Sequence, residues 1–170
     1  MRNIYISGSF DPLHESHLAI AHHLEKVYPD CNIVFELCNR PYQKAELTNE
    51  EINKRVRQFM TIFREYVVTN ATSFIDKSLH LEKFKTDNEK TEFAIGLDTL
   101  ERICDKKFYF NSNDEMLRCI NKMKSRNILF HVFPRFGYEF ACPEYIKDIC
   151  VFHNSFEPSD VSSTKIRNGQ

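Results

Sequence analysis

Short apolar runs alternate along the chain with segments whose apolar residues recur at helical spacing. Strand-like runs cover residues 3–7, 32–37, 67–69, 92–97, 127–133 and 149–153, and their length and composition are typical of buried strands. Helical periodicity marks residues 16–28, 52–66, 76–84, a segment beginning near 98, and 114–124. This alternation predicts an α/β fold, a doubly wound parallel sheet with helices on both faces.

In such a fold, the residues that follow the strand ends are the first candidates for ligand binding. In open parallel sheets, ligands bind outside the carboxyl ends of the strands. The first predicted strand ends at Gly8, and the fourth passes through Gly96 to Asp98. Only four glycines occur in the chain, so the position of Gly8 and Gly96 at predicted strand ends is informative.

Composition narrows the class of protein. The 170 residues, 42% hydrophobic and 28% charged, predict one soluble globular domain over residues 1–170. A net charge of −1 provides no global basic field for nucleic acid, so phosphate recognition must be local. The chain has six cysteines but no CxxC pair, and its N-terminus lacks a signal-peptide pattern, so we expect free thiols and a cytoplasmic location. Because no apolar run reaches about 20 residues, we expect no membrane contact.

The segment GSFDPLHESH, residues 8–17, combines several phosphate-binding features. Gly8 allows a turn and a close approach of phosphate, and Pro12 stiffens the loop. His14 and His17 lie three apart at a predicted helix start, on one side of its first turn. A helix N-terminus attracts anions, and imidazoles donate hydrogen bonds to phosphate, most strongly when protonated. On their own, these histidines are also compatible with a surface position or a metal pair.

The segment VSSTKIR, residues 161–167, has related chemistry near the end of the chain. Asp160 or Ser162 is placed to cap a short helix. The first turn of that helix would present hydroxyls, backbone N–H groups and the cations Lys165 and Arg167, again an anion-binding arrangement. Taken alone, this segment is better interpreted as a polar C-terminal tail.

Together the two segments resemble the GxFxPxHxGH and ISSTxIR signatures of the nucleotidylyltransferase superfamily, in the same order and about 150 residues apart. The resemblance spans nearly the whole chain and implies a Rossmann-like fold. It further implies that the histidines contact a triphosphate and stabilise the transition state, and that the second segment binds the β- and γ-phosphates. The implied ATP-binding set is Gly8, Ser9, Phe10, His14, His17, Gly96, Asp98, Ser162, Ser163, Thr164 and Arg167. Ser16 replaces the glycine usual before the second histidine.

The resemblance also assigns residues between the signatures. A lysine after the second strand reaches the acceptor phosphate in this superfamily, which makes Lys44 the candidate, with Arg55 assisting; the alternative for both is a solvated surface charge. Gly96 and Asp98 resemble the GxD pattern of nicotinamide-nucleotide adenylyltransferases, although Asp98 would also suit a helix cap. The expected catalytic set is His14, His17, Lys44 and Arg167.

The expected activity is transfer of AMP from ATP to nicotinamide mononucleotide, with Mg²⁺ arriving on ATP and no all-protein metal site. The partners are therefore ATP and a small phosphorylated acceptor, and an oligomer of identical chains is left open. Because tryptophan is absent, an aromatic such as Tyr42, Phe108, Tyr109 or Phe110 would stack on the acceptor. Alternatives are another acceptor such as phosphopantetheine, a CTP-dependent reaction, or a nucleotide-binding regulatory module, which Ser16 and a short terminal helix favour.

Overall fold

The computed structural model describes residues 2–85 and 89–169. These residues form two compact units. The first unit contains the residues up to Lys85 together with those from Val161 onward, and the second contains the residues up to Asp160. The expectation of one domain over residues 1–170 stays a prediction.

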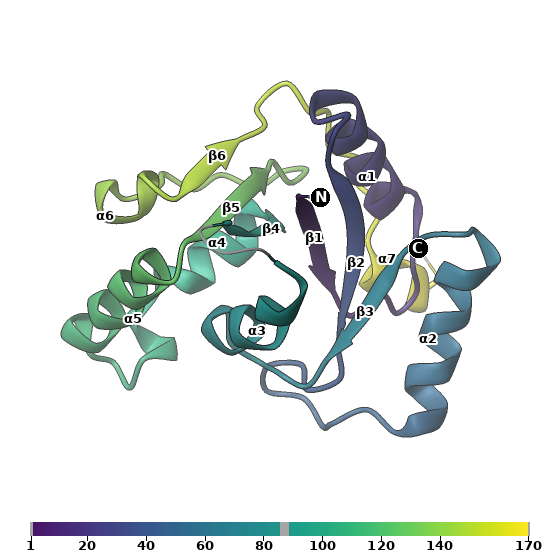
Figure 1. The fold of residues 1–170 in the computed structure, drawn as a ribbon, viewed down its shortest axis with the longest axis horizontal. Helices are drawn as coiled ribbons and strands as arrows, with labels where there is room; N and C mark the ends of the chain where they lie inside the picture. Colours follow the sequence, from purple (N-terminus) through teal and green to yellow (C-terminus); the bar gives the residue numbers. More distant parts are fainter. Residues whose placement is uncertain (1, 86–88, 170) are drawn as a thin grey trace. The chain divides into compact units, whose positions relative to one another are not determined.

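The described residues of the first unit form three parallel strands in the order β3-β2-β1, with four α-helices and one 3₁₀ helix (Figure 1). Its elements are β1 (Asn3–Gly8), α1 (Glu15–Val27), β2 (Asn32–Cys38), α2 (Asn49–Thr61), β3 (Tyr66–Thr69), α3 (Phe74–Leu81), η1 (Glu82–Phe84) and α7 (Ser163–Arg167).

The second unit continues the same alternation with three further parallel strands, in the order β4-β5-β6. Its elements are β4 (Thr91–Gly96), α4 (Leu97–Ile103), η2 (Lys106–Phe108), α5 (Asn113–Ser125), β5 (Ile128–Phe133), α6 (Glu144–Lys147) and β6 (Cys150–Phe152). The predicted α/β class with parallel strands is confirmed. Helix α6, only four residues long, was not anticipated because it is too short to show a period.

Adjacent residues of β2 show how helices cover both faces of the first unit. The ring of Phe35 packs on Phe59 of α2, with centroids 5.1 Å apart. The neighbouring Glu36 points to the opposite face, where its carboxylate lies 3.0 Å from the Lys77 ammonium of α3. Successive strand residues face opposite sides, so α2 and α3 cover opposite faces, as predicted. Both Glu36 and Lys77 are buried, and this pairing compensates their charges.

Helix α2 ends earlier than its apolar period predicts. The helical spacing continues through Phe63 to Tyr66, but the helix stops at Thr61. Phe63 adopts a left-handed φ of 55° and is 95% exposed. Backbone hydrogen bonds from Phe63 N–H to Met60 and from Arg64 N–H to Phe59 close the helix end. The period was misleading because Tyr66, the first residue of β3, falls in helical register by coincidence.

Two predictions from composition can be compared with the structure. The six cysteines carry free thiols. No helix within residues 2–85 or 89–169 has the length and apolarity needed to cross a membrane.

Candidate active site

Helix α2 holds the loop that follows β1 through three side-chain contacts. Gln58 accepts a hydrogen bond from Leu13 N–H and donates one to the Phe10 carbonyl, both at 2.8 Å. The Arg55 guanidinium donates to the Ser9 carbonyl at 3.0 Å. Gln58 was missed in the sequence, although it lies one turn after Arg55 on the same helix face, a spacing that could have suggested a shared role. The loop is therefore held by side chains of α2.

Phe10 anchors this loop in the core, which changes the reason for Gly8. The Phe10 ring is 1% exposed and packs edge-on against Phe59 and His17, at centroid distances of 5.1 and 4.9 Å. A Cβ atom at Gly8 would lie 3.0 Å from Phe10 Cζ, a tight contact that the Phe10 ring would have to relieve by shifting. Glycine at this position thus leaves room for the Phe10 ring. Because that ring is buried, any contact of Phe10 with ATP would come from its backbone.

His14 and His17 lie together at the start of α1, as their spacing predicts. Their rings are stacked with centroids 3.8 Å apart and planes inclined by 24°. Nδ1 of His14 accepts the Ser16 N–H, and Nδ1 of His17 accepts the His14 N–H, each at 3.2 Å. A nitrogen that accepts a hydrogen bond carries no proton, so these bonds assign the neutral Nε2–H tautomer to both rings.

This arrangement opposes protonation of both rings together. Two unit charges about 4 Å apart repel by about 4 kcal/mol at the effective dielectric typical of protein surfaces. Protonating Nδ1 would also remove the acceptors that cap α1. In the neutral tautomer that these hydrogen bonds favour, each ring would donate to phosphate through Nε2–H, and stronger donation by a protonated ring stays a prediction.

The second segment meets the first directly. The Ser163 hydroxyl donates to the Pro12 carbonyl at 2.7 Å, and the Ser16 hydroxyl donates to the Val161 carbonyl at 3.4 Å. Ser162 caps α7 by accepting the Lys165 N–H. Figure 1 shows α7 beside the start of α1, where these contacts occur. We call this region the motif junction: residues 11–17 and Arg55 of α2 with residues 161–167.

Asp11 lies between two arginines of the motif junction. Its carboxylate is 3.4 Å from the Arg55 guanidinium and 3.6 Å from that of Arg167. Arg167 also donates to the Asp11 backbone carbonyl and, at 3.2 Å, to the Thr164 hydroxyl. The Arg55 side chain is only 12% exposed, whereas that of Arg167 is 41% exposed. Arg55 therefore braces the loop, and Arg167 is the cation open to an incoming anion.

The remaining predicted site residues belong to other elements. Lys44 is exposed in the turn after β2, where its N–H donates to the Pro41 carbonyl. Gly96 and Asp98 belong to the second unit, at the end of β4 and in the first turn of α4. There the Asp98 carboxylate lies 3.4 Å from the Arg135 guanidinium. The cap of α4 is Gly96, without a side-chain hydrogen bond, so the capping alternative for Asp98 is not observed.

Burial separates the candidate stacking aromatics. Tyr109 donates its hydroxyl to the Ile103 carbonyl at 2.8 Å, and burial raises the pKa of that phenol; it is a structural residue. Phe108 is half-buried beneath the Lys107 ammonium. Tyr42 in the first unit and Phe110 in the second are exposed, so these two rings are accessible for stacking.

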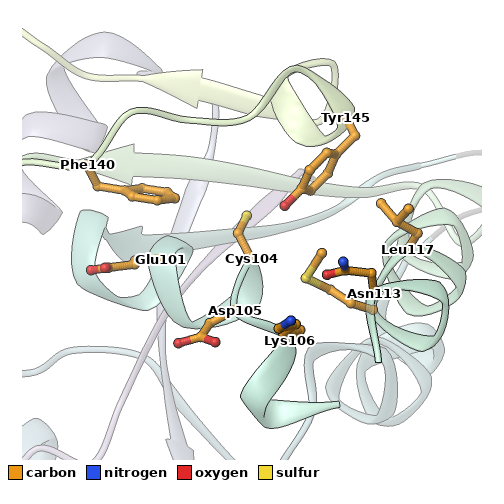
Figure 2. A pocket seen from close by; sticks show the side chains of 9 residues that line it. Glu101, Cys104, Asp105, Lys106, Asn113, Leu117, Phe140 and Tyr145 are labelled. Carbon is orange, nitrogen blue, oxygen red and sulfur yellow. The ribbon is translucent and has the colours of Figure 1, made fainter. Parts of the chain in front are cut away.

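The second unit contains a cavity of about 510 Å³ (Figure 2). Its lining consists of Glu101, Cys104, Asp105, Lys106, Asn113, Met116, Leu117, Phe140 and Tyr145. The Tyr145 hydroxyl points toward Cys104 and donates to its sulfur. Burial raises the pKa of this thiol to about 12. The carboxylates of Glu101 and Asp105 outnumber the single ammonium of Lys106 and would repel a polyphosphate. The cavity therefore does not match the chemistry of a triphosphate site.

Two solved structures of similar fold are of the same enzyme. The chain is similar to Plasmodium falciparum nicotinic acid mononucleotide adenylyltransferase complexed with NaAD, with 19% identity and a TM-score of 0.59. It is also similar to the same enzyme complexed with APC, with 16% identity and a TM-score of 0.60. Each match covers 99% of this chain and 83% of the other, which shows a shared Rossmann-like fold.

A comparison with curated proteins finds no match. The family model described as Cytidylyltransferase-like matches residues 5–169, from β1 to the end of α7. That match includes both segments of the motif junction, and this chain therefore belongs to the cytidylyltransferase-like family.

Proposed function

We propose that this protein transfers the AMP group of ATP to nicotinamide mononucleotide, forming NAD and releasing pyrophosphate. The observation that carries the proposal is the motif junction, which joins the histidine pair of α1 to the hydroxyl-bearing start of α7 within one unit. Family membership supports nucleotidyl transfer. The GxD pattern at Gly96 and Asp98, with the likeness to a nicotinic acid mononucleotide adenylyltransferase, supports a pyridine-nucleotide acceptor.

The reaction requires positioning and charge stabilisation rather than a base. The acceptor phosphate is already a nucleophile; its oxygen attacks the α-phosphorus in line, and the bond to the pyrophosphate oxygen breaks. In this proposal, the Nε2–H groups of His14 and His17 donate to phosphate oxygens as negative charge moves toward the leaving group. Arg167 and Lys165 bind the β- and γ-phosphates at the start of α7.

The loop is preorganised for this role, because Gln58 and Arg55 hold its backbone through three hydrogen bonds. Magnesium carried by ATP would neutralise part of the triphosphate charge. Imidazole, hydroxyl and guanidinium groups dominate the junction and suit phosphate oxygens. Asp11, whose side chain is 45% exposed, is the carboxylate there that would contact the ion.

The acceptor assignments rest on position. Lys44 is exposed in the turn after β2, and we assign it to the acceptor phosphate. Tyr42, two residues earlier and also exposed, would stack on the pyridine ring. The Arg55 side chain contacts Ser9 and Asp11, so its contribution to the acceptor would be made through the loop that it braces.

The proposal is tested by pyrophosphate release from ATP and Mg²⁺ with a panel of phosphorylated acceptors. Release with nicotinamide mononucleotide, with NAD as product, is the expected result. If pyrophosphate is released only with nicotinic acid mononucleotide or phosphopantetheine, or only when CTP replaces ATP, nucleotidyl transfer is retained but the proposed pair of substrates is wrong. ATP binding without release for any acceptor would favour a regulatory module.

A further inference from the structure

A buried ion pair links β2 to α3 in the first unit. The Lys77 ammonium lies 3.0 Å from one carboxylate oxygen of Glu36, and the Thr69 hydroxyl of β3 donates to the other. All three residues are buried, and the Glu36 side chain has no exposed area. Each oxygen of the carboxylate therefore has a donor, and the group joins two strands and a helix.

Thr69 also holds the start of the loop that follows β2. Its backbone carbonyl accepts the Asn39 N–H at 3.0 Å. Three residues further along the chain, the Thr72 hydroxyl donates to the Arg40 carbonyl at 2.9 Å. Thr69 therefore contacts the buried carboxylate with its side chain and the loop with its backbone, so the position of the carboxylate affects the position of the loop.

The loop is closed by hydrogen bonds of its own backbone. The Leu47 N–H donates to the Asn39 carbonyl at 2.9 Å, and the Lys44 N–H donates to the Pro41 carbonyl at 3.2 Å. The two exposed residues that we assign to the acceptor, Tyr42 and Lys44, lie within this closed segment. Their position in the first unit therefore depends on Asn39, where the loop both begins and closes.

Stability alone does not explain why this buried pair is charged. Taking the charges of Glu36 and Lys77 out of water is costly, and apolar residues of similar volume often stabilise such a place as well or better. A carboxylate with a separate donor on each oxygen fixes the direction of both donors, because a hydrogen bond depends on angle as well as distance. Apolar packing would impose no such direction on Thr69, the residue that reaches the loop.

We propose that Glu36 and Lys77 are positioning residues, which hold Thr69, and through it the loop at residues 39–47, in the geometry that binds the acceptor. The acceptor role of this loop rests on the proposed function, whereas the hold of the ion pair on the loop does not. The motif junction is formed by other elements of the first unit, so its contacts with ATP should not depend on this pair.

The hold on the loop is tested by amide hydrogen exchange of the full chain, a readout that requires no turnover. Glu36→Leu combined with Lys77→Met removes both charges and fills their place with apolar side chains of similar volume, so the fold should be retained. We expect the N–H groups of Asn39 and Leu47 to exchange about tenfold faster than in the wild type, because the hydrogen bonds that protect them open more often. Unchanged exchange at both positions would overturn positioning.

Two further proteins make this result specific. Thr69→Val keeps the shape of the side chain but removes the hydroxyl that reaches the Glu36 carboxylate, so exchange at Asn39 should again be faster; this variant decides the question if the double variant does not fold. Glu25→Leu combined with Arg64→Met is the matched control, because it removes another ion pair of the first unit, between α1 and the segment after α2. Equally fast exchange in that control would assign the effect to general loosening and overturn positioning.

The effect on acceptor binding is measured by steady-state kinetics of the variant that carries both Glu36→Leu and Lys77→Met. We expect the KM for nicotinamide mononucleotide to rise about tenfold, while the KM for ATP stays within about twofold of the wild-type value. An equal rise of both constants, or no rise of either, would overturn positioning of the acceptor loop. Faster exchange in the loop, together with no release of pyrophosphate by the wild type, would overturn only the proposed function.

Discussion

The Ser163 hydroxyl donates to the Pro12 carbonyl at 2.7 Å, across 151 positions of sequence. This contact joins the loop after β1 to the start of α7. Each segment alone offers only one helix start and a few polar groups, which are too few donors for a whole triphosphate. Joined, they place imidazole, hydroxyl and guanidinium donors around one loop.

Removing that hydroxyl is expected to weaken the motif junction. Ser163→Ala leaves the Pro12 carbonyl without its donor and should lower the free energy of unfolding by about 1 kcal/mol. ATP affinity should fall about fivefold, because a difference of 1 kcal/mol at the junction corresponds to that ratio. Calorimetric titration with ATP and urea unfolding measure the two effects. Ser125→Ala removes an exposed hydroxyl of α5 bonded to Lys122 and should change neither.

His17→Ala should abolish most turnover while the fold is retained. Loss of a donor aimed at developing charge lowers kcat by about 10²–10³-fold. The substitution also removes the acceptor of the His14 N–H, a capping loss of about 1 kcal/mol. His17→Asn, whose amide can both accept and donate, should restore the cap and part of the rate.

The control for His17 is His22→Ala, on the same helix and with a side chain 69% exposed. That variant should have the turnover of the wild type. Wild-type turnover in His17→Ala would remove this histidine from the mechanism.

Gly8→Ala tests the packing of Phe10. The new Cβ would lie 3.0 Å from the Phe10 ring, and such overpacking costs about 1–3 kcal/mol. Phe10→Leu should suppress this loss in the double variant, because the smaller side chain removes the clash. Urea unfolding of the wild type, the two single variants and the double variant gives the coupling energy between the two positions. Additive losses of unfolding free energy would show that Gly8 does not serve to accommodate the Phe10 ring.

Alkaline pH should destabilise the second unit. Burial raises the pKa values of the Cys104 and Cys150 thiols to about 12, from an ordinary value of 9.0. The folded state therefore retains protons that the unfolded state releases, and the stability present below pH 9 is lost progressively as the pH rises toward 12. Unfolding free energies across this range measure the slope. Cys104→Ala should reduce it, and an unchanged slope would assign the effect elsewhere.

Periodicity and strand-end chemistry predicted much of this molecule. The alternation of apolar runs identified each strand of the described residues to within one residue at either end. The two signatures identified residues that the fold brings into contact, including Ser16, whose hydroxyl bonds to the Val161 carbonyl. A serine in place of the usual glycine thus adds one side-chain contact to the junction.

Side-chain contacts between distant elements could not be predicted in this way. Three contacts depend on residues that the fold brings together: Gly8 beside the Phe10 ring, Gln58 against the loop, and the buried hydrogen bonds of His131 with Glu92 and His153. A period shows which face of an element is apolar. It does not show which partner a buried glutamate or histidine meets across a sheet.

The most direct test of nucleotidyl transfer follows the α-phosphate itself. ATP labelled with ³²P at the α-position is incubated with the protein, Mg²⁺ and nicotinamide mononucleotide, and the products are separated. The label is predicted to appear in NAD, with one unlabelled pyrophosphate released for each NAD, and chelation of Mg²⁺ should abolish transfer. Label that remains in ATP, or appears only in free AMP, would contradict the account.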